Sequence, residues 1–176
     1  MLPAVVLALA LAVPSVPPGR VADYAGVLTP REAEKLESRL AERERATGVQ
    51  MVVAVFPSLA GESLEDYSIR LAGQWRIGRR GLDDGVIFLV FVEERRMRLE
   101  VGYGLEAVLP DAAAGRIIRE AVAPHFRQRR YADGLQAGVD AVFERVGGGA
   151  PAPPAPGRRV PGWWGVWLFP LFVVFW

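Results

Sequence analysis

Two kinds of apolar pattern alternate along residues 21–146. In four stretches the apolar residues recur every three or four positions, which predicts helices with one buried face. In three others they run almost continuously or alternate strictly, which predicts strands. The predicted helices cover residues 30–46, 63–75, 112–126 and 133–146, and the predicted strands cover 49–56, 86–92 and 97–101. The expected order is therefore α-β-α-β-β-α-α.

The strand patterns indicate how the sheet is covered. Residues 49–56 (VQMVVAVF) and 86–92 (VIFLVFV) are apolar at almost every position, as in strands buried on both faces. A crossover helix between them implies a parallel, right-handed connection. Residues 97–101 alternate and follow a short polar turn, which predicts an antiparallel hairpin partner. The expected fold class is α/β, a three-layer α/β/α sandwich with a small mixed sheet.

Helix-capping residues stand at the expected boundaries. Residues 29–32 (TPRE) form a capping box with proline at the first helical position, and Gly48 provides a stop. Ser63, Asp111 and Asp133 can cap the later helices. We therefore expect a single α/β domain over residues 20–149.

The two ends of the chain differ from the middle. Residues 1–13 (MLPAVVLALALAV) are apolar and lead into small residues and prolines, so residues 1–18 are predicted to be a signal peptide. Residues 150–160 form a linker rich in proline and alanine. Residues 161–176 are apolar and rich in tryptophan and phenylalanine, which predicts membrane contact. Because a spanning helix needs roughly 20 apolar residues, this segment is either a truncated span or an interfacial one.

These ends predict a domain that lies outside the cytoplasm, periplasmic or on the cell surface, and is anchored to the cytoplasmic membrane. One observation opposes this orientation. Arg158 and Arg159 precede the last apolar run, and basic residues beside a span favour the cytoplasmic side. We give the signal peptide more weight, because two arginines are a weak signal.

Composition excludes several kinds of site. The chain has 176 residues, a formal net charge of +1, no cysteine and one histidine, His125. Without cysteines there are no disulfides, thiolate metal sites or thiol nucleophile. One histidine excludes paired-histidine metal motifs. The near-zero net charge gives no overall field for nucleic acid, so we expect no nucleic-acid partner.

Acidic residues gather at one predicted end of the sheet. Asp83 and Asp84 precede the strand over 86–92, while Glu106 and Asp111 follow its antiparallel partner. Hairpin topology places these loops side by side. Carboxylates and carbonyl oxygens suit calcium, or magnesium with retained waters. Turn chemistry at Asp84 and helix capping at Asp111 are the structural alternatives.

Other candidate residues give weaker signals. The sequence Gly102-Tyr103-Gly104 is too short for a dinucleotide-binding motif and indicates backbone permissiveness near the acidic residues. Arg76, Arg79 and Arg80 could hold an anionic substrate or pair with the neighbouring aspartates. No Ser-His-Asp triad is apparent.

Several motifs in order resemble the TPM domain family. They are VADYAGVLT from Val21, TGVQMVVAVFPSLAGESLEDYS from Thr47, WRIG from Trp75 with Asp84-Gly85-Val86, and EVGYGLEAVLPDA from Glu100. Members typically carry an export signal, then the domain, then a membrane helix. Many also have a glycine- and serine-rich tail, which this chain lacks.

The resemblance implies binding of calcium or another divalent ion at positions that match Asp83, Asp84, Glu106 and Asp111. Asp23 matches an N-terminal acidic position of the family. Thylakoid-lumen relatives are described as acid phosphatases, and other relatives act as accessory subunits of membrane receptors.

Two functions follow as hypotheses. The first is an ion-binding accessory module for a membrane protein complex. The second is a metal-dependent acid phosphatase, in which the ion would polarise a phosphoryl oxygen and activate water. Because the sequence shows no obvious nucleophile or general base, we favour the accessory module.

Overall fold

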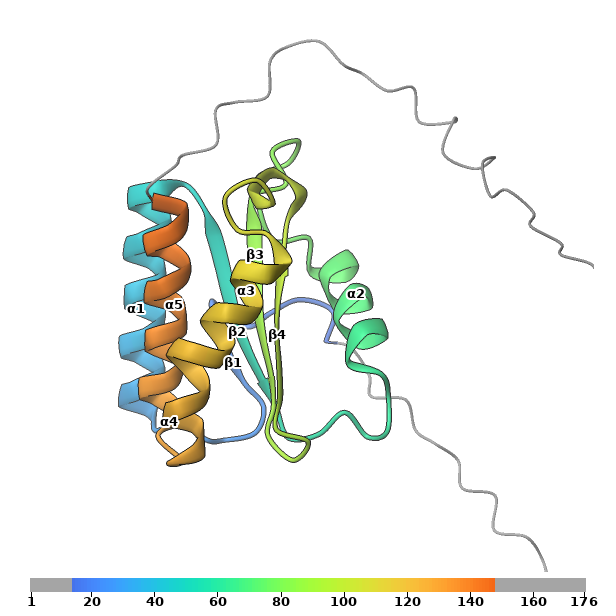
Figure 1. Cartoon of the computed structure of the whole chain (residues 1–176), viewed down its shortest axis with the longest axis vertical. Coiled ribbons are helices and arrows are strands. Elements are labelled where there is room, and N and C mark those ends of the chain that lie inside the picture. The colour runs from blue at the N-terminus through green and yellow to red at the C-terminus, as the bar shows by residue number, and fades with distance from the viewer. Residues whose placement is uncertain (1–13, 148–176) are drawn as a thin grey trace, which may run out of the picture.

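A four-stranded sheet lies at the centre of the computed structural model, which describes residues 14–147 (Figure 1). The strands lie across the sheet in chain order, β1-β2-β3-β4. The first three are parallel, and β4 is antiparallel to β3. Their bounds are β1 Val21–Asp23, β2 Gln50–Phe56, β3 Gly85–Phe91 and β4 Arg96–Val101. The mixed sheet and its parallel central pair confirm the prediction.

Strand β1 is an addition to the predicted order. It has three residues and pairs with β2 from Val21↔Val53 to Asp23↔Val55. Three residues are too few for an alternating pattern to be recognised, so the pairing itself defines this strand. The observed order starts β-α-β-α-β-β and continues with helical segments.

Helices cover both faces of the sheet, as predicted. Figure 1 shows α2 on one face and α1, α3, α4 and α5 on the other. Successive residues of β2 alternate between two buried clusters: Met51, Val53 and Val55 join one, and Val52, Ala54 and Phe56 join the other. The helix bounds are α1 Pro30–Thr47, α2 Leu64–Trp75, α3 Asp111–Ile117, α4 Ala123–Arg127 and α5 Tyr131–Gly147. The three-layer α/β/α architecture is therefore confirmed.

The predicted capping box at the start of α1 is present. The Thr29 hydroxyl accepts the backbone N–H of Glu32 at 3.3 Å, and the Glu32 carboxylate accepts the N–H of Thr29 at 2.8 Å. At the other end Gly48 adopts φ 76°, and its N–H bonds to the carbonyl of Glu44. Both ends of this helix are thus determined by local sequence.

The helix predicted over residues 112–126 is interrupted. A π-helical turn at Ile118–Val122 separates α3 from α4, and Pro124 lies in the first turn of α4. Proline has no N–H, and its ring clashes with the carbonyl four residues earlier in a regular α-helix. A widened turn before the proline removes this conflict, so the predicted helix is present but contains a π-helical turn that was not predicted.

The predicted terminal segments lie largely outside the described residues. This applies to residues 1–13 of the signal peptide, to the linker over 150–160 and to the membrane segment over 161–176. Within residues 14–147, no helix combines the length and apolar character needed to cross a membrane.

Candidate functional site

The predicted acidic residues lie around the end of the sheet where β3 begins and β4 ends. Val86 of β3 pairs with Val101 of β4, and Gln50 of β2 pairs with Gly85. The loops over residues 76–84 and 102–110, here called the acidic-end loops, therefore emerge together (Figure 1, top). The N–H of Gly104 bonds to the carbonyl of Asp83 at 3.0 Å, which ties the two loops directly. The sequence-based placement of these loops is confirmed.

Glycines allow the acidic-end loops to touch through their backbones. A Cβ at Gly85 would stand 1.9 Å from the carbonyl oxygen of Ile77, and a Cβ at Gly104 would stand 1.9 Å from that of Leu82. Gly102 would meet the Asp83 carbonyl at 2.1 Å. No side chain fits at these distances, so glycine is required for backbone contact.

Asp84 is buried and already paired. Its side chain is 0% exposed and meets Arg79 three times: the Nε at 2.6 Å, the Nη2 at 2.5 Å and the backbone N–H at 2.7 Å. Such charge-assisted bonds stabilise a buried carboxylate that would otherwise be costly to desolvate. As arranged, Asp84 holds the first loop in place. It could bind a cation only if Arg79 moved away.

Asp83, Glu106 and Asp111 are exposed, and among the described residues their side chains have no hydrogen-bond or ion-pair partner. Asp83 has φ 48°, a left-handed conformation in the turn before β3. Pro110 is the N-cap of α3 and Asp111 makes no capping bond, so the capping role considered for Asp111 is wrong. Across residues 14–147, no three acidic or histidine side chains gather closely enough to hold a metal ion.

A groove of about 690 Å³ opens beside Asp83, on the face of the sheet covered by α2. Charged and aromatic side chains line it, among them Arg76, Arg79, Arg80, Asp83, Glu100 and Tyr103. Sequence reasoning had singled out the three arginines but gave no side-chain role to Tyr103, which is 80% exposed. A large aromatic exposed between two glycines was the available signal.

Asp23 has a structural role at the opposite end of the sheet. Its Oδ1 accepts the backbone N–H groups of Ala25 at 3.1 Å and Gly26 at 2.9 Å, and its Oδ2 accepts that of Leu28 at 2.8 Å. One carboxylate thus organises the turn from β1 into α1. This accounts for the pattern DYAGVL.

The possible nucleophiles and bases lie elsewhere or are engaged. The Ser58 hydroxyl donates to the Glu94 carboxylate at 2.6 Å, and Ser63 caps α2 by accepting the N–H of Asp66 at 3.2 Å. Burial raises the pKa of Tyr67 to about 12, so its hydroxyl stays protonated near neutral pH. Among the described residues, neither of these two serines bonds to His125.

Three solved structures have similar folds. The solution NMR structure of an N-terminal domain of a protein from P. gingivalis is 36% identical, with a TM-score of 0.69, covering 77% of this chain and 87% of that one. The BA42 protein of the psychrophilic bacterium Bizionia argentinensis is 19% identical, with a TM-score of 0.63 and coverage of 70% and 84%. The N-terminal domain of cg2496 from Corynebacterium glutamicum is 15% identical, with a TM-score of 0.58 and coverage of 80% and 85%. The last two support the fold alone.

Family membership rests on sequence as well as fold. No curated protein matches the chain. A family model described as the TPM domain matches residues 21–145, from β1 into the last turns of α5. This range contains both acidic-end loops and the Asp23 turn. The chain therefore belongs to the TPM domain family.

Proposed function

We propose that this protein is an extracytoplasmic binding module, tethered to the membrane, that binds a divalent cation at the acidic-end loops and assists a membrane protein complex. Calcium is the proposed ion, with magnesium as the second choice. One observation carries the cation site: Asp83 and Glu106 present free carboxylates on two loops that are fixed to each other, and Asp111 adds a third at the start of α3, directly after the second loop.

Carboxylate and carbonyl oxygens are ligands that a hard cation prefers. In the structure, however, these carboxylates are not gathered around one point. Calcium takes six to eight oxygen ligands from carboxylates, carbonyls and water in flexible geometry. Because the carboxylates are not gathered, binding requires side chains of the loop over 102–110 to turn towards Asp83. Asp84 remains with Arg79 in this proposal and supports the loop without contacting the ion.

Calorimetry on the full chain in a zwitterionic nanodisc tests the cation site. Calcium should bind, and Asp83→Asn or Glu106→Gln should weaken binding by roughly tenfold, since each removes one charged ligand. Glu93→Gln is the matched control, because Glu93 is an exposed carboxylate beyond the far end of β3. Equal affinity in all variants would place the ion elsewhere.

Membrane tethering and partner binding need separate tests. The full chain should fractionate with membranes, and deletion of residues 160–176 should release a folded domain. Chemical cross-linking in intact membranes should then join the full chain to a membrane protein, and the deletion variant should lose this product. Recovery of the full chain entirely in the soluble fraction would contradict the tether.

Metal-dependent phosphatase activity is the second candidate. It is favoured by the groove, in which Arg76, Arg79 and Arg80 stand beside Asp83. Guanidinium groups recognise phosphate oxygens in a bidentate manner. Hydrolysis of a generic phosphate ester, measured with and without calcium or magnesium, distinguishes the two functions. Metal-dependent turnover that Arg80→Gln reduces would favour the enzyme.

A further inference from the structure

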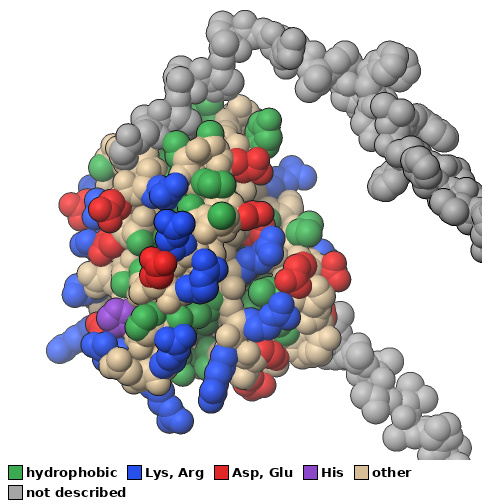
Figure 2. Space-filling model, in the orientation of Figure 1, with side chains coloured by type: hydrophobic (Ala, Val, Ile, Leu, Met, Phe, Trp, Pro, Cys, Tyr) green, Lys and Arg blue, Asp and Glu red, His purple; other side chains and the backbone are tan. Residues whose placement is uncertain are grey.

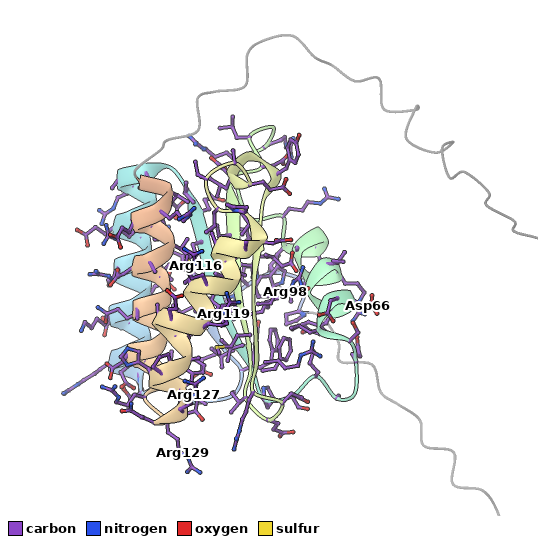
Figure 3. All side chains as sticks on the ribbon, viewed as in Figure 1. Asp66, Arg98, Arg116, Arg119, Arg127 and Arg129 are labelled. Atoms are coloured by element: carbon purple, nitrogen blue, oxygen red, sulfur yellow. The ribbon has the colours of Figure 1, made fainter. Side chains whose placement is uncertain are left out.

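A second cavity lies at the opposite end of β3 from the acidic-end loops. Its volume is about 410 Å³, and it opens where β3 ends and β4 begins, next to α4. Apolar side chains form much of its wall, including Met97, Phe126 and Tyr131, while Arg95, Arg127 and Arg129 contribute its positive charge. Figure 2 shows hydrophobic side chains between Lys and Arg side chains in this lower part of the face. Figure 3 shows Arg127 and Arg129 at the lower end of α4. We call this the arginine cavity.

The three arginines of this cavity have no anionic partner. Among the described residues none of their side chains makes an ion pair or a hydrogen bond. Several arginines elsewhere in the domain are paired, among them Arg20 with Glu37 and Glu44, and Arg39 with Asp140. Three unpaired cations around one partly apolar space repel one another unless an anion joins them. The charge of the cavity is therefore complementary to an oxyanion.

Two of these arginines occupy backbone positions where glycine is usual. Arg129 has φ 58° and follows α4 in a Schellman motif, in which the N–H of Arg130 bonds to His125 and that of Arg129 to Phe126. Arg95 has φ 55° in the turn between β3 and β4. Left-handed backbone is unfavourable for residues with a Cβ and tends to persist at ligand-binding sites.

The apolar wall of the cavity indicates that the ligand has an apolar part beside its anionic group. Phe126 and Tyr131 meet edge to face with ring centroids 5.2 Å apart, and Met97 adds a flexible apolar side chain. The volume falls within the range of pockets for small organic ligands, roughly 300–1,000 Å³. A bare inorganic anion would leave this apolar surface uncovered.

We propose that the arginine cavity binds a small organic anion, with a phosphate-like or carboxylate oxyanion at the arginines and an apolar or aromatic body against Met97, Phe126 and Tyr131. The site goes beyond the proposed cation site, since it uses other residues at the other end of β3. It also requires no catalysis.

Calorimetry with benzylphosphonate on the full chain, in nanodiscs of phosphatidylcholine, tests this proposal. Benzylphosphonate combines a stable oxyanion with an aromatic body, whereas methylphosphonate and benzyl alcohol each supply one part. The complete ligand should bind at least roughly tenfold more tightly than either part, because both halves of the cavity contribute. Failure of benzylphosphonate to bind, or equal binding by all three compounds, would overturn the proposal.

Matched variants locate the binding. Arg127→Gln and Arg129→Gly should each weaken benzylphosphonate by roughly tenfold, since each removes a charged donor. Arg129→Gly also relieves the left-handed backbone, so a loss of affinity with an unchanged or higher Tm cannot result from unfolding. Arg119→Gln is the control: Arg119 belongs to the same helical run but does not line the cavity (Figure 3). An equal loss in this control would show general charge attraction and overturn the site.

A lipid headgroup could supply the same chemistry as a free anion, and a nanodisc exchange separates the two sources. With phosphatidic acid in the nanodisc, a lipid ligand would compete and weaken benzylphosphonate in the wild type. A free anion as the natural ligand predicts unchanged affinity. Once benzylphosphonate is known to bind the arginine cavity, either result shows whether the natural ligand is a lipid headgroup or a free anion.

Discussion

The two ends of β3 place different demands on the backbone and meet them with different residues. At the amino end, Gly85 and Gly104 let one loop lie against the backbone of another. At the carboxyl end, Arg95 and Arg129 adopt left-handed backbone that glycine would adopt more easily. Glycine is needed where main chains must touch, because no side chain fits there. At Arg95 and Arg129 a side chain does fit, and both side chains line the arginine cavity.

The largest effect is expected from a side chain placed at the amino end. Gly85→Ala would put a methyl group 1.9 Å from the carbonyl oxygen of Ile77, so the loop must move. We expect a loss of about 3 kcal/mol in the free energy of unfolding, measured in urea. Gly73→Ala is the control, since no atom lies within 4 Å of the position that its new methyl group would take, and alanine favours the helix α2. The control should gain about 0.5 to 1 kcal/mol.

The next effect concerns the buried ion pair at the same end. Arg79→Ala leaves Asp84, which is 0% exposed, with only a backbone N–H donor. We expect a loss of about 2 kcal/mol, less than for a wholly buried pair because the Arg79 side chain is half exposed. Chemical unfolding of Arg79→Ala measures this loss of stability, and Arg80→Ala is the control. If the two variants unfold alike, Asp84 does not depend on its pair.

A gain in stability, and not a loss, is expected from a substitution at the carboxyl end of β3. Arg129→Gly should raise the free energy of unfolding by about 0.5 kcal/mol, because relief of left-handed strain slightly exceeds the greater flexibility of glycine in the unfolded chain. Arg127→Gly lies within α4 and should instead lower it by about 1 kcal/mol. A stability loss in both variants would mean that the Arg129 turn is not strained.

The smallest effect depends on pH and concerns the start of α1, also at the carboxyl end of the sheet. Bonds from the backbone and hydroxyl of Thr29 lower the pKa of Glu32 below its ordinary value of 4.5. A lowered folded-state pKa contributes stability that is present above about pH 4.5 and lost as the pH falls through the folded value. The Tm difference between wild type and Glu32→Gln should therefore be largest near neutral pH and shrink in acid. A constant difference would contradict this role for the charge.

Much of the fold could be predicted because the local pattern of apolar residues shows which faces of a helix or strand are buried. Continuous apolar runs predicted β2 and β3, and alternation predicted β4. Residues 29–32 predicted the start of α1, since a capping box is satisfied within four residues. The π-helical turn between α3 and α4 was missed, although Pro124 was a visible signal for it. β1 was missed because three residues carry no recognisable pattern.

The candidate sites were predictable only in part. Hairpin topology brought Asp83 and Glu106 to the same end of the sheet, as expected. The sequence could not show that Asp84 would turn inward to Arg79, or that Asp111 would remain uncapped and exposed. Calcium binding and the membrane tether stay predictions.

The sequence by itself determined which faces of β2, β3, α1 and α2 are buried, the order of the elements from α1 onward, and that acidic residues meet at one end. The tertiary structure alone decided which carboxylate is neutralised, and that Arg95 of the β3–β4 turn and Arg129 after α4 share one cavity. The physical reason is the distance along the sequence over which each effect acts. Periodicity and capping act over a few residues, whereas these juxtapositions depend on how a hairpin and a helix, distant in sequence, pack on the same sheet.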